Sequence, residues 1–340
     1  MNLIESIDTL KKKIRENGFD DLFLILEDEL KKSLHMFWEM AGKILDGTSV
    51  KLLEPPNGYY NLENNFFSAM FLYSYYRAGI ASEKRILYSA INQCLRGMVT
   101  GCDNLLDDEY KKTLETSLPE KGKKFRSVLD IMVSDRVLFE LSLNVFKDDK
   151  RVLKASEISL RSLVESGYQE ASEEGGIDEI LMPDKVLSAI HHFKTGILFK
   201  CPWAIPSIIE SIDEKEINNL NQALYNIGMG CQVMDDMTDI KRDIQTKHHN
   251  YVASLIYYKS GRGRWKELES LLLLNENKAN SEDILTEFDD ARDRAIEKAR
   301  SYLTAGLNEL FDEKHRFLVE LSIEFLATKI GVEKYFREKE

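Results

Sequence analysis

Four aspartates crowd the stretch GCQVMDDMTDIKRD, residues 230–243, and their spacing suits metal binding. Asp235 and Asp239 are four residues apart, so on a helix their carboxylates share one face. Asp236 lies beside them and Asp243 follows one turn later. Like charges at this spacing repel each other and destabilise a bare helix by a few tenths of a kcal/mol per pair. A bound Mg²⁺ reverses that effect, because it prefers carboxylate, water and phosphate oxygens. The segment therefore predicts a magnesium site.

A second acidic cluster lies upstream in GCDNLLDDEY, residues 101–110. Asp103 and Asp107 repeat the four-residue spacing, and Asp108 and Glu109 extend the cluster. Two such helices facing each other across a cavity would hold several Mg²⁺ ions around a diphosphate. The calcium-binding EF-hand is excluded, because its ligand spacing, its glycine and its final glutamate are all missing.

An ordinary solvated helix face is the simplest explanation for any one acidic cluster. Two features favour metal binding instead. The clusters are two rather than one, and each is flanked by apolar residues: Val99 and Leu105 upstream, Val233 and Met234 downstream. Neither segment is therefore expected to face solvent along its whole surface.

The elements that must position these carboxylates are predicted to be helices. Nearly every periodic segment has the spacing of an amphipathic helix, and strand-like alternation is almost absent. Turn residues at 54–58, 117–122 and 173–178 separate the segments, and Pro202 and Pro206 should end or kink the helix before them. We expect a single all-α domain over residues 1–340, with helices near 3–16, 20–46, 62–80, 82–109, 123–147, 150–173, 183–200, 214–244, 247–260, 263–275, 281–310 and 315–337.

The overall charge narrows the function further. A net charge of −12 argues against a nucleic-acid binder or a polybasic membrane anchor, and it requires a cation to bridge any anionic substrate. No apolar run is long enough for a transmembrane segment, and residues 1–18 lack the features of a signal peptide. The four cysteines are scattered, which favours a reduced, cytoplasmic protein.

The chain resembles the trans-isoprenyl diphosphate synthases and their class I terpene synthase relatives. Residues 228–239, GMGCQVMDDMTD, resemble the second aspartate-rich motif of that family, with Gln232 three residues before the first aspartate. Residues 193–202, FKTGILFKCP, resemble the lysine–threonine segment whose lysine contacts the diphosphate, here Lys194. These two segments are the more specific part of the resemblance.

The rest of the resemblance extends over about residues 90–310. The stretch DNLLDDE at 103–109 is similar to the first motif, with Asn104 in place of its second aspartate. SDRVLFEL at 134–141 matches the helix that follows that motif in the family. The implied fold is a single helical bundle of the isoprenoid-synthase type around a central hydrophobic cavity.

The resemblance also implies roles for individual residues. About three Mg²⁺ ions would hold an allylic prenyl diphosphate, and a homodimer is possible. Catalytic roles fall to Asp103, Asp107, Asp235, Asp239 and Lys194. The implied metal ligands are Asp103, Asp107, Asp108, Asp235, Asp236 and Asp239, and the implied diphosphate contacts are Lys194, Gln232, Arg242 and Lys247.

Departures from the family bear on the reaction. Chain-elongating members carry basic segments before and after the first motif that bind isopentenyl diphosphate. Here residues 62–74 hold no basic residue, and residues 110–127 have no Arg-Arg pair. Since a second diphosphate needs several cationic donors, the sequence favours a terpene synthase that ionises one allylic diphosphate and releases pyrophosphate.

Two alternatives stay open. A chain-elongating prenyltransferase would need a second diphosphate site built differently, from Lys111, Lys112, Lys123, Lys124 and Arg126. A helical regulatory subunit without catalysis is the other alternative, although it has no need to keep mutually repelling carboxylates together.

Histidines near these motifs are expected to play ordinary roles. His191 and His192 are adjacent, so on a helix they point about 100° apart and share no face. We expect them to lie on a helix surface or to form hydrogen bonds. His249 and Asn250 follow the second cluster closely enough to contact a diphosphate oxygen.

Overall fold

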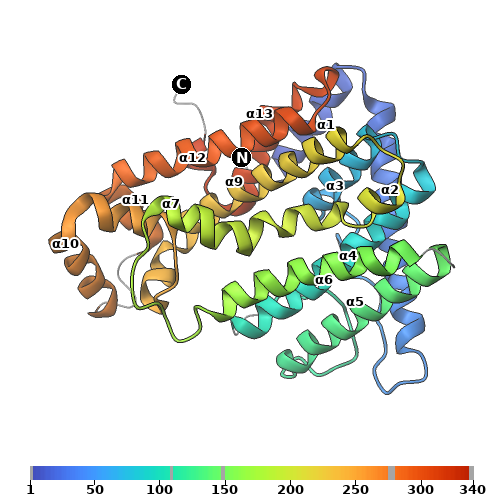
Figure 1. The fold of residues 1–340 in the computed structure, drawn as a ribbon, viewed down its shortest axis with the longest axis horizontal. Helices are drawn as coiled ribbons and strands as arrows, with labels where there is room; N and C mark the ends of the chain where they lie inside the picture. The colour runs from blue at the N-terminus through green and yellow to red at the C-terminus, as the bar shows by residue number, and fades with distance from the viewer. Residues whose placement is uncertain (1–2, 108–109, 147–149, 275–279, 337–340) are drawn as a thin grey trace. The chain divides into compact units, whose positions relative to one another are not determined.

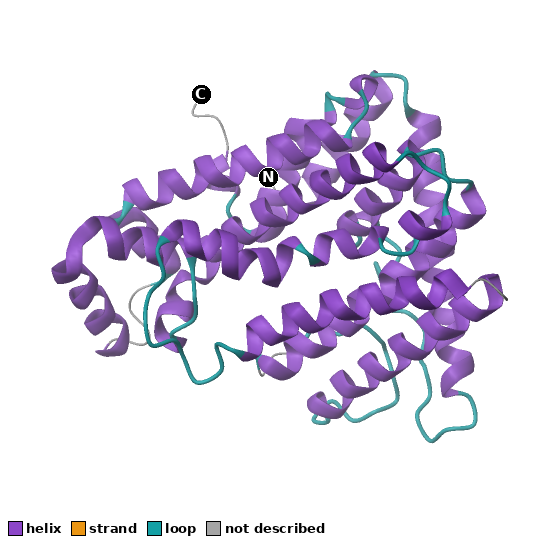
Figure 2. Cartoon of the chain, in the orientation of Figure 1, coloured by secondary structure: helices purple, strands orange, loops and turns teal. Residues whose placement is uncertain are grey.

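The computed structural model of the chain describes residues 3–107, 110–146, 150–274 and 280–336. Over these ranges the chain consists of helices and loops, and the one β-pairing found there is an isolated bridge between Leu52 and Thr116 (Figure 2). The expected all-α class is confirmed. Within the same ranges, every helix is too short or too polar to cross a lipid bilayer.

The helices follow the predicted segments closely (Figure 1). In chain order they are α1 (Leu3–Glu16), α2 (Asp20–Leu45), η1 (Leu62–Asn64), α3 (Phe66–Arg77), α4 (Ser82–Leu106), α5 (Lys123–Phe146), α6 (Lys150–Ala171), α7 (Pro183–Lys185), η2 (Val186–Gly196), η3 (Leu198–Trp203), α8 (Pro206–Ile209), α9 (Glu214–Thr246), α10 (Tyr251–Leu274), α11 (Ser281–Glu287), α12 (Asp289–Leu310), η4 (Glu313–His315), α13 (Leu318–Ile330) and α14 (Glu333–Phe336).

The chain divides into two compact units. Unit 1 comprises Met1–Leu10, Val164–Lys200 and Asn219–Glu340, and unit 2 comprises Lys11–Leu163 and Cys201–Asn218. Each unit is therefore assembled from separate stretches of the sequence. The expected single domain over residues 1–340 stays a prediction.

Unit 2 is built around α4, which packs on α2, α3 and α5. Glycines let α4 and α5 approach closely, because a Cβ on Gly97 would lie 2.1 Å from Ser134 Oγ. Tyr75 is fully buried in this unit, and its hydroxyl donates a hydrogen bond of 2.6 Å to the carbonyl of Pro202. Residues 201–218 are thereby fastened to α3, far from them in sequence.

Unit 1 is built around α9, which carries the second acidic cluster. Its Gly230 lies against Leu303 and the Ala299 carbonyl of α12, where an added Cβ would come within 2.6 Å of Leu303 Cγ. Seven residues earlier, the carbonyl of Ala223 lies close to Gly306 of α12. Small residues at these points explain how two long helices pack tightly along their length.

The helical segment η2 has unusual hydrogen bonding. Residues 183–200 were expected to form one helix, but η2 is a π-helix, and the N–H of Ile197 bonds the carbonyl of His192 at 3.0 Å. Stretches of π-helix are rare and occur frequently at functional sites. Gly196 lets η2 approach α9, because a Cβ there would lie 2.4 Å from the ring of Tyr225.

Prolines and a left-handed residue set the remaining boundaries. Pro202 lies in the short 3₁₀ segment η3 and Pro206 begins α8, so the expected break after η2 is confirmed. The helix expected from residue 247 begins at Tyr251 instead. Lys247 explains the delay, because its φ of 57° cannot continue a right-handed helix.

Candidate functional site

The second acidic cluster presents its carboxylates in two directions from α9. Asp235 is exposed and Asp239 is half-buried. Asp236 and Asp243 are buried residues, only 3% and 6% exposed. Arg242 lies next to Asp239, with its Nη2 2.7 Å from Oδ2 of that carboxylate. One helix segment thus carries two accessible carboxylates and two buried ones.

Asp236 is held by three neighbouring segments. The backbone N–H of Tyr251 donates to its Oδ2 at 2.5 Å, and Gln232 Nε2 donates to its Oδ1 at 3.2 Å. His191 of η2 is buried beside it, with Nε2 2.9 Å from Oδ2 but outside good hydrogen-bond alignment. Because Asp236 is buried and both of its oxygens accept hydrogen bonds, it is less accessible to a metal ion than Asp235.

Asp243 lies two turns after Asp236 on the same face of α9, and it is tied to the loop after the helix. Asn250 Nδ2 donates to Asp243 Oδ2 at 2.8 Å and also to the backbone carbonyl of Asp236 at 2.8 Å. Burial raises the pKa of the Asp243 carboxyl to about 7, and the charge of Asp236 adds to the rise. Asn250 therefore holds the loop against α9, rather than reaching outward.

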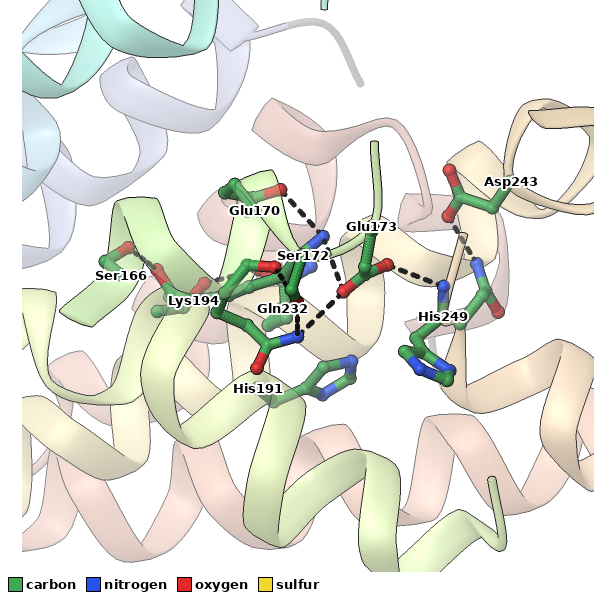
Figure 3. Close-up of polar contacts among 12 residues, drawn as sticks. Ser166, Glu170, Ser172, Glu173, His191, Lys194, Gln232, Asp243 and His249 are labelled. Carbon is green, nitrogen blue, oxygen red and sulfur yellow. Dashed lines mark hydrogen bonds and ion pairs between the residues drawn. The ribbon is translucent and has the colours of Figure 1, made fainter. Parts of the chain in front are cut away.

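Lys194 of η2 lies between two glutamates, as Figure 3 shows. Its Nζ is 2.9 Å from Oε2 of Glu170 and 3.6 Å from Oε1 of Glu173. Burial by itself lowers the pKa of Lys194, but the two carboxylates outweigh burial and raise the pKa well above its ordinary value. The next residue, Thr195, donates a hydrogen bond to the side chain of Gln232.

The loop between α9 and α10 joins these groups together. The N–H of His249 donates to Glu173 Oε2 at 2.8 Å, and the carbonyl of Lys247 accepts the N–H of Ile177 at 2.8 Å. A cavity of about 460 Å³ opens beside this loop, with Asp243, Lys247 and His249 in its wall. The aromatic residues Tyr257, Tyr258 and Trp265 also line this cavity.

The first acidic cluster belongs to unit 2 and lies at the end of a helix. Asp103 is half-buried in the last turns of α4, and Asp107 is the exposed residue that caps it. Asp108 and Glu109 lie outside the described residues. Asn104 is buried, and its side chain accepts the N–H of Lys111 at 2.7 Å and donates to the Lys111 carbonyl at 2.9 Å.

The structure thus places some, but not all, of the predicted site residues in the same unit. Lys194, Gln232 and the aspartates of α9 all belong to unit 1, with Arg242 in the last turns of that helix and Lys247 just after it. Asp103 and Asp107 belong to unit 2, so the expected facing of the two clusters stays a prediction. Within the described ranges no three metal-binding side chains form a complete group. Asp235 and Asp239 nevertheless suit Mg²⁺, which takes one or two carboxylates and completes its shell with water and phosphate.

Sequence reasoning missed several residues. Glu170 and Glu173 lie near the end of α6, in a stretch that looks like any acidic helix end, and nothing in it signals Lys194 as a partner. Arg96 was missed because it lies on α4 itself, seven residues before Asp103 and on the same helix face. Its side chain is exposed, and within the described residues its guanidinium hydrogen-bonds only Asn65, at 3.0 Å.

Comparisons with known proteins point to one group of enzymes. The polyprenyl synthetase family model matches residues 177–253. The farnesyl diphosphate synthase of Micrococcus luteus is 28% identical over 220 residues, which are 63% of this chain and 69% of that protein. The matched family segment contains Lys194, Gln232 and all four aspartates of α9.

Solved structures show the same fold. A geranylgeranyl pyrophosphate synthetase from the archaeon Geoglobus acetivorans aligns with a TM-score of 0.62 at 20% identity, covering 89% of this chain and 99% of that one. The geranylgeranyl pyrophosphate synthetase from Pyrococcus horikoshii gives 0.62 at 16% identity, with 98% and 99% covered. The heptaprenyl diphosphate synthase from Staphylococcus aureus gives 0.62 at 15% identity, with 89% and 98% covered.

Proposed function

Because the chain belongs to the trans-isoprenyl diphosphate synthase superfamily, we propose that it is a magnesium-dependent prenyltransferase that joins an allylic prenyl diphosphate to isopentenyl diphosphate. In such a reaction the allylic C–O bond breaks, the carbocation forms a bond with the second substrate, and pyrophosphate and a proton leave. The relatives favour this activity over the terpene synthase that the sequence alone ranked first, because those described above are named prenyl diphosphate synthases.

The observation that carries the proposal is the grouping on unit 1 of two accessible carboxylates with a lysine and a glutamine. Asp235 and Asp239 are accessible on α9. On η2, Lys194 pairs with Glu170 and Glu173, and the next residue, Thr195, donates a hydrogen bond to Gln232. When bound by Asp235 and Asp239, Mg²⁺ would neutralise the leaving diphosphate. We assign the same metal-binding role to Asp103 and Asp107 of unit 2, and the number of ions, about three by resemblance, is part of this proposal.

The other side chains of unit 1 bind the diphosphate or hold the binding residues in position. Lys194, Arg242 and Lys247 supply the positive charge that a diphosphate needs, each through charge-assisted hydrogen bonds. Asp236 and Asn250 keep the end of α9 and the following loop together, since their hydrogen bonds stay inside the protein. We therefore give Asp236 a positioning role in place of the metal-binding role expected from the sequence.

Arg96 supports the chain-elongating reaction. A second substrate with a diphosphate needs a cation outside the first site, and Arg96 lies two helical turns before Asp103. The residue is exposed, although burial around its guanidinium lowers the pKa of that group. Its hydrogen bond to the neutral Asn65 leaves its charge uncompensated there, so an anion would be attracted to it. We propose that Arg96 contacts the diphosphate of isopentenyl diphosphate.

The one-substrate terpene synthase remains a second candidate because of Arg126. This residue was expected to help bind a second diphosphate, but it is buried, and its Nε donates to the Pro119 carbonyl at 3.1 Å. Its Nη2 donates to the carbonyl of Leu118. Lys112 is paired with Glu115 at 3.0 Å. Arg126 and Lys112, both considered for that second site, are thus already engaged.

Product analysis distinguishes the candidates. The full chain is incubated with Mg²⁺ and allylic diphosphates of several lengths, with and without isopentenyl diphosphate. We expect longer prenyl diphosphates only when isopentenyl diphosphate is present. Hydrocarbon or alcohol formed with pyrophosphate from the allylic substrate alone would establish the terpene synthase instead. No turnover in any tube would overturn both and favour the regulatory subunit.

The variant R96M tests whether Arg96 binds isopentenyl diphosphate. Loss of one charge-assisted hydrogen bond should raise KM for isopentenyl diphosphate roughly tenfold or more. KM for the allylic diphosphate should change much less. An equal change in both values would remove Arg96 from the proposed second-substrate site.

We also propose that α5 forms a homodimer surface. Phe125, Met132 and Phe139 recur every seven residues on this helix, and all three are exposed, Met132 by 60%. Leu143 continues the stripe one turn later. A sustained apolar stripe on an exposed helix is typical of a protein–protein contact, and a second copy of the chain could present the same stripe across a two-fold axis. The change M132E should convert a dimer to a monomer in light scattering, whereas an unchanged mass would exclude this surface.

A further inference from the structure

One lysine in unit 1 has two carboxylate partners that differ in their surroundings. Glu173 is 2% exposed, and its carboxylate accepts hydrogen bonds from Gln169 Nε2 at 3.1 Å and from the N–H of His249 at 2.8 Å. Glu170 lies one turn closer to the start of α6, and its side chain is 30% exposed. It nevertheless makes the shorter contact with Lys194.

The buried partner connects three segments of the chain. Glu173, in the turn just after α6, contacts Lys194 on η2 and the backbone of His249 in the loop after α9 (Figure 3). That loop carries Lys247 and Asn250, which lie next to the acidic end of α9. Because a buried charge is stable only when it is paired and hydrogen-bonded, Glu173 cannot easily leave this place.

Glu170, the more exposed of the two partners, is held less firmly. Glu170 makes one described ion pair, and solvent reaches its carboxylate, so leaving Lys194 costs it little. Two negative charges around one ammonium group also leave this spot with a net negative charge. A diphosphate that approaches Lys194 must therefore replace one of the two carboxylates, and Glu170 is the one that can yield.

We propose that Glu173 is a positioning residue that holds Lys194 in the diphosphate site, and that Glu170 is the exchangeable partner that the diphosphate replaces. This inference rests on the proposed function only in taking a diphosphate as the ligand of Lys194. It gives Lys194 a fixed place before substrate binds. Until the diphosphate binds, Glu170 pairs with the ammonium group of Lys194.

A double-mutant cycle tests the positioning role. Affinity of the full chain for pyrophosphate with Mg²⁺ is measured by calorimetry for wild type, E173Q, K194M and the double variant. Glutamine at 173 keeps an oxygen for the His249 N–H but loses the charge that holds Lys194. E173Q and K194M should each weaken binding roughly tenfold or more, and the double variant should be no weaker than K194M.

Additive effects in this cycle would overturn the proposal, because they would mean that Glu173 acts through the loop rather than through Lys194. The result is separable from the proposed function, since pyrophosphate binding requires no turnover. A chain that binds pyrophosphate with the expected coupling but forms no product would refute the proposed reaction and leave this inference standing.

The exchange role has a separate test in E170Q. Removing the competing charge should tighten pyrophosphate binding several-fold, the opposite sign to E173Q. The matched control is E174Q, which removes the same charge from the exposed residue beside Glu173 and should leave the affinity at the wild-type value. Unchanged or weakened binding in E170Q would contradict exchange at Lys194.

Discussion

The two acidic clusters have the same sequence spacing and very different surroundings. In unit 1 the cluster lies inside the long helix α9, so its neighbouring turns dictate which carboxylates face the protein. In unit 2 the cluster lies where α4 ends, and Asp107 caps the helix with its N–H bonded to the Asp103 carbonyl at 2.8 Å. The second polar residue is also different: Asp236 is tied to other segments, whereas Asn104 holds its own following loop.

This difference teaches that a carboxylate's role depends on its place in the helix as well as on its spacing. Asp235 and Asp236 are adjacent in sequence, yet one is exposed and the other is buried among donors. Burying a carboxylate is costly unless donors compensate it, so Asp236 is expected to contribute to stability and Asp235 to chemistry.

The largest expected effect comes from the exposed carboxylates of α9. D235N removes a proposed magnesium ligand, so kcat/KM for the allylic diphosphate should fall roughly 10²–10³-fold. D103N should cause a loss of similar size if both clusters bind metal. Steady-state kinetics across a range of Mg²⁺ concentrations checks this. Full activity in D103N would mean that the cluster of unit 2 takes no part.

Substitution of the buried carboxylate Asp236, next to Asp235, should affect stability more than metal binding. D236N replaces an acceptor of two hydrogen bonds, one from a backbone N–H, so it should lower the free energy of unfolding by about 2–4 kcal/mol. Its apparent affinity for Mg²⁺ should change much less than in D235N. Chemical denaturation and magnesium titration of both variants provide the comparison. Normal stability together with lost Mg²⁺ affinity would return Asp236 to the metal ligands.

Unit 2 has a buried carboxylate whose effect depends on pH. Asp130 of α5 is 2% exposed, and burial raises the pKa of its carboxyl to about 6. A raised pKa means that the folded protein binds this proton more tightly than the unfolded chain does. Its contribution to stability is therefore complete below the ordinary aspartate pKa and is lost as pH rises through about 6.

D130N should remove this dependence, because an amide imitates the protonated acid. Between about pH 4 and about pH 8, wild type should lose on the order of 2–3 kcal/mol more stability than D130N. Urea denaturation at several pH values measures the difference. Parallel pH profiles for the two proteins would show that Asp130 does not titrate in this range.

The smallest effect is expected from the polar residue that replaces an aspartate in the first cluster. N104A loses two hydrogen bonds to the backbone of Lys111, so unfolding should become easier by about 1–2 kcal/mol. Activity should fall modestly, because the loop after Asp107 loosens while the carboxylates remain. A loss of activity as large as that of D103N, with stability intact, would instead indicate a direct contact of Asn104 with substrate or metal.

Much of the fold followed from the sequence, because helical periodicity and turn residues are local signals. The break near Pro202 and Pro206 could be predicted, since proline removes a donor and fixes φ. The π-helical hydrogen bonding of η2 could not, because it depends on the contact of Gly196 with Tyr225 of α9. The late start of α10 depends on the left-handed conformation of Lys247, which few non-glycine residues adopt.

The candidate site was only partly predictable for the same reason. Asp235, Asp239 and Lys194 belong to short motifs that can be read directly from the sequence. The burial of Asp236 and the pairing of Lys194 with glutamates depend on segments that are distant in sequence. The place of Arg96 depends on the face of the helix on which it lies. His191 was expected to lie on a helix surface or to form hydrogen bonds, but it is buried beside Asp236.

The central claim is that the acidic segment of α9 binds a diphosphate through Mg²⁺. Calorimetric titration of pyrophosphate into wild type and D235N, with Mg²⁺ or with a chelator, tests it most directly. We predict that wild type binds only when Mg²⁺ is present and that D235N binds far more weakly. Equal binding by the two proteins, or binding that persists in the chelator, would contradict the claim.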